Sequence, residues 1–186
     1  MTKKKAKAGK RFVLIAAALA GGAVLVIGCA NMMSSSGGGG AGGAKPVSVS
    51  DTPVVTSSVR RSLEAFQGRV VILDFWATWC PPCRAEIPDF ITLQNQYRAQ
   101  GLEVVGVSID PIAPQGGGAP AVAPFMKRYG INYTILMVND PSAMDGYEVN
   151  RGIPTTFIID RGGRITKTYV GQKTLRQFEQ DIKALL

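Results

Sequence analysis

The sequence predicts an α/β domain in which helices flank a central mixed sheet. Two observations indicate this fold class. Apolar, β-branched runs alternate with segments of helical periodicity in the order strand, helix, strand, and the chain ends with a hairpin pattern followed by an amphipathic helix. With 186 residues, the chain has room for one domain of ordinary size. We place this domain at residues 47–186.

The first strong strand is expected at residues 70–73 (Val-Val-Ile-Leu), a continuous apolar run typical of a buried strand. A helix should follow, because Pro81 and Pro82 suit a first helical turn and apolar residues then recur at helical spacing until Gly101. Before this strand, residues 47–69 indicate no more than a short strand and a helical turn.

The middle of the chain predicts a second strand and then an inserted helix and strand. Residues 103–109 form another apolar run, so a parallel pair joined by a right-handed crossover is expected. Residues 110–120 hold three prolines and three consecutive glycines and predict a loop. No Gly-Lys-Ser/Thr sequence follows, so we do not expect phosphate binding there. Residues 121–129 favour a helix and residues 132–138 a short strand.

The last third predicts a hairpin and a covering helix. Residues 155–160 and 164–170 read as strands, with glycines at the bend between them, so antiparallel strands should end the sheet. Thr174 is the expected N-cap of the final helix, whose apolar residues fall on one face.

The positive charge of the chain is concentrated at its start. Six of the 21 Lys and Arg residues lie within residues 3–11, and the rest of the chain is nearly balanced despite a net charge of +8. We therefore exclude nucleic acid as a partner. Residues 12–29 contain no charged residue and predict an export signal or membrane anchor. The positive-inside rule then places the domain on the extracytoplasmic, periplasmic side of the inner membrane.

Two further features concern the tether. Residues 26–29 (Val-Ile-Gly-Cys) resemble the bacterial lipobox, which implies a lipid anchor on Cys29. An uncleaved signal-anchor helix with an incidental cysteine is the alternative, and residues 1–29 form this segment in both cases. Residues 30–46, rich in Ser and Gly, predict a flexible linker.

The strongest motif is Cys80-Pro-Pro-Cys83, where the predicted strand gives way to the helix. Free N–H groups and the positive end of the macrodipole at a helix N-terminus stabilise a thiolate. Cys80 is the predicted nucleophile and Cys83 the resolving cysteine of a redox disulfide. A zinc site is disfavoured because the chain has no histidine and only one other cysteine. A static disulfide would close too short a loop to stabilise much.

The residues from Leu73 to Pro88 (Leu-Asp-Phe-Trp-Ala-Thr-Trp-Cys-Pro-Pro-Cys-Arg-Ala-Glu-Ile-Pro) resemble the thioredoxin superfamily, in its TlpA/ResA-like membrane-anchored branch. The resemblance extends to residues 152–157 and covers about residues 60–186. It implies a thioredoxin-like fold with an extra helix-strand insertion, no cofactor, and a cis proline beside Cys80. The substrate-binding residues that it implies are Trp79, Pro81, Pro82, Ile153 and Pro154.

Two acids are candidates for managing protons, because release of Cys83 as a thiolate requires a nearby base. Asp74 matches the buried aspartate of thioredoxins, and its strand neighbours favour burial. Glu86 matches the acid three residues after the second cysteine in ResA-like proteins. An exposed carboxylate on the helix face is an equally open interpretation of Glu86, and which acid dominates stays open.

The resemblance implies a protein-disulfide reductase that takes electrons from a membrane thiol donor and reduces disulfides in exported proteins, with apocytochrome c as the suggested partner in cytochrome c maturation. A dithiol oxidase would share nearly every motif. A thiol peroxidase would need a threonine-containing nucleophile loop that residues 77–80 do not match. A copper-binding module would need a wider cysteine spacing and usually a histidine. A non-catalytic protein-binding module is the remaining alternative.

Overall fold

The computed structural model describes residues 52–113 and 115–186. The expected signal or anchor segment, Cys29 and the linker at residues 30–46 therefore lie outside the described residues. Among the residues that are described, no helix is both long and apolar enough to cross a membrane.

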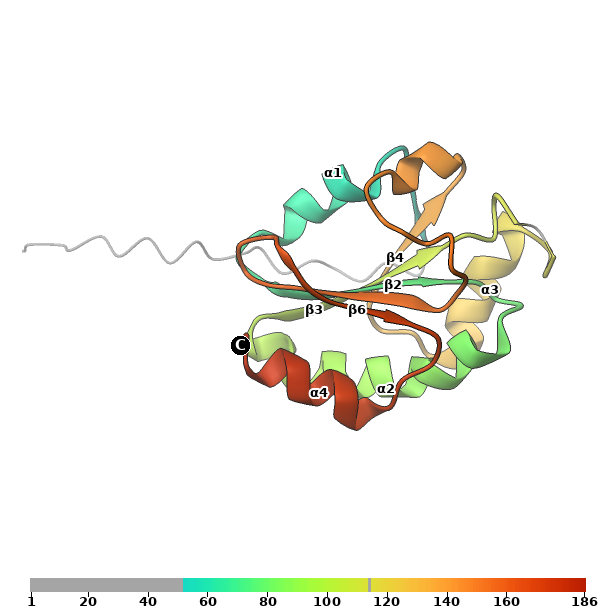
Figure 1. Cartoon of the computed structure of the whole chain (residues 1–186). Helices are drawn as coiled ribbons and strands as arrows, with labels where there is room; N and C mark the ends of the chain where they lie inside the picture. Colours follow the sequence, from blue (N-terminus) through green and yellow to red (C-terminus); the bar gives the residue numbers. More distant parts are fainter. Residues whose placement is uncertain (1–51, 114) are drawn as a thin grey trace, which may run out of the picture. The chain divides into compact units, whose positions relative to one another are not determined.

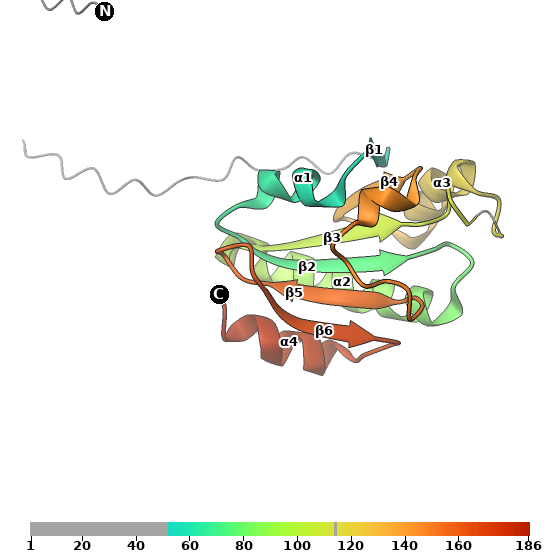
Figure 2. The ribbon, with the colours of Figure 1, turned by 45° about the horizontal axis from the view of Figure 1, so that its top comes forward.

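One mixed sheet organises the described part of the chain. Its six strands lie in the order β1-β4-β3-β2-β5-β6 (Figure 2). Strands β1, β4, β3 and β2 are parallel to one another, whereas β5 and β6 are antiparallel to their neighbours. The strands are β1 (Val54–Thr56), β2 (Val70–Trp76), β3 (Leu102–Ser108), β4 (Thr134–Val138), β5 (Thr155–Ile159) and β6 (Ile165–Val170).

Helices cover both faces of this sheet. Helices α2 and α4 lie on one face, and α1 with the 3-10 turn η3 lies on the other (Figure 1). Two apolar clusters fill the layers: α2, α3 and α4 pack with one, and α1 and η3 with the other. The helices are α1 (Val59–Leu63), α2 (Pro81–Tyr97), α3 (Ala119–Tyr129) and α4 (Leu175–Lys183), and the 3-10 turns are η1 (Glu64–Phe66), η2 (Arg98–Gln100) and η3 (Pro141–Met144).

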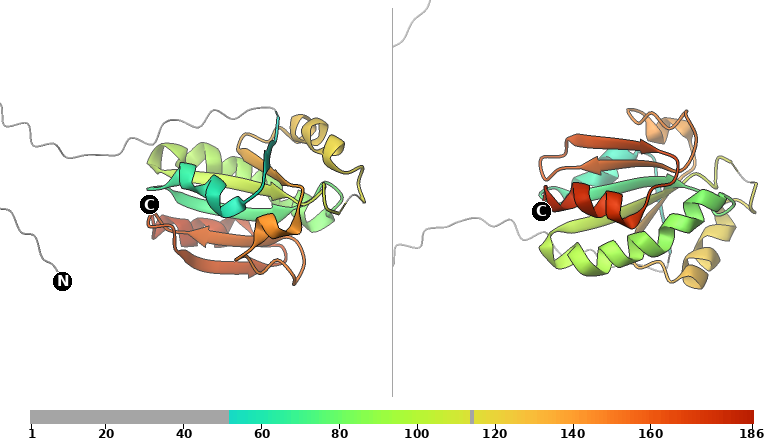
Figure 3. Two further views of the ribbon diagram at one scale, coloured as in Figure 1. Left: turned by 90° about the horizontal axis from the view of Figure 1, so that it is seen from above. Right: turned by 60° about the horizontal axis from the view of Figure 1, so that its bottom comes forward.

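The predicted topology is correct for the central strands. All seven residues of β2 and of β3 are buried, as continuous apolar runs in the middle of a doubly covered sheet should be. The predicted parallel pair is confirmed with α2 as its crossover. The predicted insertion is also confirmed: α3 leads into β4, which pairs with β3. Figure 3 shows α3 beside the N-terminal end of α2.

The chain's last third agrees with its prediction as well. Strands β5 and β6 form the antiparallel hairpin, and β6 is largely exposed, as expected at the sheet edge. Thr174 caps α4 in a capping box with Gln177. The register of β2 against β5 places Asp74 opposite Thr156. This pairing brings the buried carboxyl of Asp74 close to a hydroxyl donor.

Candidate redox site

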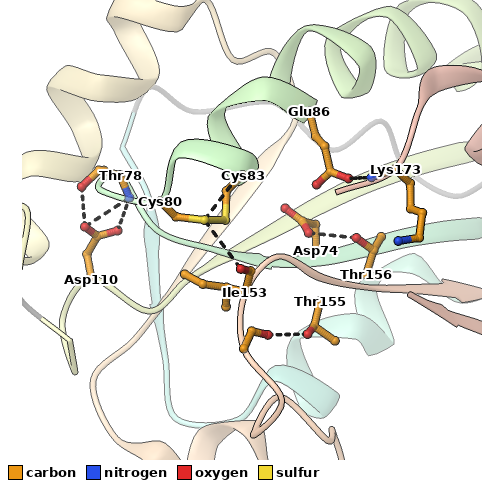
Figure 4. Close-up of a disulfide and its surroundings, with 11 residues drawn as sticks. Asp74, Thr78, Cys80, Cys83, Glu86, Asp110, Ile153, Thr155, Thr156 and Lys173 are labelled. Carbon is orange, nitrogen blue, oxygen red and sulfur yellow. Dashed lines mark hydrogen bonds between the residues drawn. A yellow bond between two sulfur atoms is a disulfide. The ribbon is translucent and has the colours of Figure 1, made fainter. Parts of the chain in front are cut away.

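The two cysteines lie where the strand-to-helix motif predicts. Strand β2 ends at Trp76, and α2 begins at Pro81 with Cys80 as its N-cap. The backbone N–H of Cys83 donates to Cys80 Sγ over 3.3 Å. A disulfide joins Cys80 to Cys83, with their Cα atoms 5.3 Å apart (Figure 4). The sulfur of Cys80 thus lies at the positive end of α2, where a thiolate would be stabilised after reduction.

The turn before β5 lies against this disulfide. The Ile153-Pro154 peptide bond is cis, as the resemblance implies. The carbonyl oxygen of Ile153 lies 3.8 Å from Cys80 Sγ. Cys80 and Cys83 are only 3% and 1% exposed, so little of either cysteine is open to a partner. The remaining residues of the implied binding surface are more open: Trp79 and Pro82 are half-buried and Pro81 is exposed.

Both candidate acids lie in the layer between β2 and α2, with their carboxyl groups pointing toward one another (Figure 4). Asp74 is buried, as expected. Glu86 is 0% exposed, so the interpretation of Glu86 as an exposed helix-face carboxylate is wrong. Burial occurs because the chain between β6 and α4 covers it: the backbone N–H of Lys173 donates to Glu86 Oε1. Glu86 Oε2 has no hydrogen-bond partner within the part of the chain that the structure describes.

Burial raises the pKa of both carboxyl groups, but the other groups that act on each pKa differ. Burial raises the pKa of Glu86 to about 7, although the N–H and the charge of Lys173 oppose this rise. Burial raises the pKa of Asp74 well above its usual value, and the charge of Glu86 adds to this effect. The hydroxyl of Thr156, 3.0 Å from Asp74 Oδ1, opposes it. Glu86 therefore changes its charge near neutral pH and lies one helical turn after Cys83 on the same helix.

A buried phenol belongs to the same polar group, and the sequence analysis missed it. Tyr133, just before β4, is 2% exposed. Burial raises the pKa of its hydroxyl well above 10, and the charges of Asp74 and Glu86 raise it further. Tyr133 is thus a neutral phenol at every physiological pH. No local pattern marks it, because a tyrosine at the start of a short strand is ordinary core material.

Asp110 is a second residue that the sequence analysis missed. Asp110 is 0% exposed, and its side chain accepts a hydrogen bond from Ser108. It also accepts hydrogen bonds from both the backbone N–H and the hydroxyl of Thr78 (Figure 4). Thr78 stands two residues before Cys80. The sequence held a signal for Asp110, because β2 and β3 are parallel neighbours whose carboxyl ends meet at one edge of the sheet, and Asp110 lies two residues after the end of β3.

The described residues offer little for a metal ion. Within residues 52–113 and 115–186, no group of three or more Cys, Asp or Glu side chains is arranged to hold one. The carboxyl groups of Asp110 and Asp74 instead accept hydrogen bonds within the fold. The arrangement can form and break one disulfide beside two buried carboxyl groups.

Comparisons with known proteins agree with this geometry. The AhpC/TSA family model matches residues 51–168. A Bacillus subtilis protein named thiol-disulfide oxidoreductase ResA is 35% identical over 119 residues, which span 64% of this chain and 63% of that protein. The Geobacillus kaustophilus ResA is 30% identical over 66% of this chain and 67% of its own length.

Solved structures are similar in fold. A thiol:disulfide interchange protein of the thioredoxin family from Chlorobium tepidum superposes with a TM-score of 0.58 at 31% identity, over 66% of this chain and 83% of that one. StoA from Bacillus subtilis gives a TM-score of 0.52 at 28% identity, over 61% and 82%. The described fold is therefore thioredoxin-like.

Proposed function

Because this chain belongs to the AhpC/TSA family, we propose that it is a thiol-disulfide oxidoreductase whose working dithiol is Cys80 and Cys83. One observation carries the proposal: the Cys80–Cys83 disulfide lies at the N-terminus of α2, against the Ile153 carbonyl, with the buried Glu86 one turn further along the helix. This combination provides an activated sulfur, an edge for a partner chain and a proton acceptor.

The reaction follows from these positions. In the reduced protein, the Cys80 thiolate attacks a disulfide of the partner, whose S–S bond breaks while a mixed disulfide forms and one partner thiolate leaves. Cys83 then transfers its proton to a buried carboxylate and attacks Cys80 Sγ. The mixed disulfide breaks, the second partner thiolate leaves, and the Cys80–Cys83 disulfide forms. Two electrons pass from the dithiol to the partner.

We further propose that the electrons flow in the reducing direction, outside the cytoplasm. The support is the resemblance to the membrane-anchored branch together with the basic start and the apolar segment at residues 12–29. The partners are then exported proteins with disulfides, including apocytochrome c, and the donor is a thiol protein of the membrane.

The first experiment is the reduction potential of the dithiol in glutathione or dithiothreitol buffers, followed by the fluorescence of Trp76 and Trp79. A value near or below about −250 mV supports a reductase. A value near about −120 mV would make the protein a dithiol oxidase. Absence of a reversible two-electron transition would contradict the thiol-disulfide proposal itself. A Cys29→Ser variant is the matched control, since the third thiol should not alter the potential.

Two measurements separate the remaining alternatives. The first measurement compares how fast the protein reduces a disulfide peptide that contains Cys-x-x-Cys-His and a scrambled peptide of equal composition. Faster reduction of the Cys-x-x-Cys-His peptide would support a role in cytochrome c maturation. Equal rates for the two peptides would contradict that role. Turnover of peroxide by a Cys83→Ser variant would instead indicate a thiol peroxidase, because the first cysteine alone would then suffice.

The tether can be tested on the whole chain in a bacterial host. If Cys29 is lipidated, mass spectrometry should find a diacylglyceryl group on a mature chain that begins at Cys29, and Cys29→Ser should abolish processing. An intact N-terminus at Met1 in the membrane fraction would identify an uncleaved signal anchor instead. Recovery of the chain in the cytosolic fraction would contradict the proposed location.

A further inference from the structure

A hollow of about 290 Å³ lies between α3 and the two residues that flank the dithiol segment, Trp79 before Cys80 and Arg84 after Cys83. Its walls come from three elements: Trp79 from the loop before α2, the first turn of α2, and the inner side of α3. Phe125 and Tyr129 of α3 stack with their ring centroids 4.1 Å apart and form one wall. Gly116 packs closely against Trp79, since a Cβ added at Gly116 would lie 2.9 Å from the Trp79 side chain.

Two arginines provide the charge of this hollow. Arg84 follows Cys83 directly, and Arg128 lies in the last turn of α3. Both are exposed, and neither forms an ion pair with any residue that the structure describes. None of the described residues that line the hollow is acidic. Two guanidinium groups without counter-charges, beside flat aromatic walls, favour a carboxylate ligand, which arginine binds through paired N–H donors.

Trp79 also lines a second hollow of different character. This hollow is lined mainly by apolar side chains, among them Ile109, Met144, Val149 and Ile153, and its charged residue is Asp145. Trp79 therefore borders both a cationic hollow and an apolar hollow with one acid. A polypeptide that brings its cysteine to Cys80 comes close to Trp79, because Trp79 directly precedes Cys80 in the chain. Its flanking side chains then meet one hollow or the other.

We propose that the hollow containing Arg84 and Arg128 binds an acidic side chain of the redox partner, located near the cysteine that forms the mixed disulfide with Cys80. The proposal rests on the proposed thiol-disulfide function and specifies its partner class: polypeptides with Asp or Glu close to the reacting cysteine. The ion pair guides the partner to the disulfide and selects against basic sequences at this position.

The test uses single-cysteine peptides activated as pyridyl disulfides and the full chain carrying Cys29→Ser and Cys83→Ser. Attack by Cys80 forms the peptide mixed disulfide and releases thiopyridone, whose absorbance gives the rate. Peptides flanked by Glu, Gln or Lys are compared at low ionic strength. We expect the Glu peptide to react faster than the Lys peptide by on the order of five-fold, with Gln between them and the difference shrinking in high salt.

Charge reversal supplies the decisive control. Arg128→Glu should remove or invert the Glu-over-Lys preference, whereas Lys127→Glu should preserve it. Lys127 is exposed in the same helical turn but does not line the hollow. The two variants therefore change net charge and helix-end electrostatics equally. If the ratio of the Glu-peptide rate to the Lys-peptide rate changes equally in both variants, or in neither, the proposal is overturned. Failure of every peptide to form a mixed disulfide would instead contradict the thiol-disulfide function.

Discussion

The buried carboxylate of Asp110 accepts hydrogen bonds from both the backbone and the side chain of Thr78, the residue two positions before Cys80. The Thr78 N–H donates to Oδ2 over 3.0 Å, and its hydroxyl donates to Oδ1 over 2.5 Å. Ser108 donates a further hydrogen bond over 2.8 Å. The end of β3 therefore fixes the loop that presents the nucleophile, although Asp110 has no direct bond to either cysteine.

Replacing Asp110 by alanine should lower the free energy of unfolding by roughly 2–4 kcal/mol, because an N–H and two hydroxyls would remain buried without acceptors. Asp110→Asn keeps one acceptor oxygen and should cost less. Thr78→Val removes only the hydroxyl donor. Urea unfolding of the oxidised protein gives the four values of a double-mutant cycle. Coupling between Asp110→Asn and Thr78→Val should reach about 1 kcal/mol. Strict additivity would contradict this account of the loop.

The structure explains which parts of the site local sequence could predict. Cys80 and Asp74 depend on one strand followed by one helix, and both lie where the pattern indicates. The burial of Glu86 depends on the backbone of Lys173, 87 residues away, which no local pattern encodes. Asp110 was predictable in principle from the expected parallel pair. It was missed because the prolines and glycines that follow it indicate only a loop.

A buried ion pair at the other end of the sheet also escaped the sequence analysis. Arg69 Nη1 lies 3.3 Å from Glu103 Oε2, and Arg69 Nη2 also donates to the carbonyls of Leu102 and Arg98. Arg69→Met would leave the fully buried Glu103 without its counter-charge and should cost about 3–5 kcal/mol of unfolding free energy. Adding Glu103→Gln should recover part of this loss. The redox potential should not change, because Arg69 lies just before β2 and Glu103 lies at the start of β3, whereas the disulfide follows the end of β2.

Glu86 makes stability depend on pH in a defined direction. Its pKa is about 7 in the folded protein and near 4.5 in the unfolded chain. Between these values the folded state binds more protons, so unfolding free energy should fall as the pH rises from about 4.5 to about 7, by on the order of 3 kcal/mol. Urea unfolding of the oxidised protein across this range measures the slope. Glu86→Gln should make this slope shallower without abolishing it, because the pKa of Asp74 is also raised well above its usual value by burial and contributes a fall of the same sign. An unchanged slope would show that Glu86 does not titrate in this window.

The titration of Glu86 should also change the rate at which Cys83 resolves the mixed disulfide. Only the carboxylate form of Glu86 can accept the proton of Cys83, so the rate of mixed-disulfide resolution should rise as the pH passes through about 7. Glu86→Gln should remove this rise and slow resolution roughly a hundred-fold at neutral pH. Asp74→Asn is the matched comparison: burial, with the charge of Glu86 adding to it, raises the pKa of Asp74 well above its usual value. If Glu86 is the base, replacing Asp74 should leave the rise in the resolution rate in place. Stopped-flow fluorescence of Trp79 can follow the step. If the rise survives in Glu86→Gln and disappears in Asp74→Asn, the base is Asp74, and Glu86 serves only to raise the pKa of its neighbour.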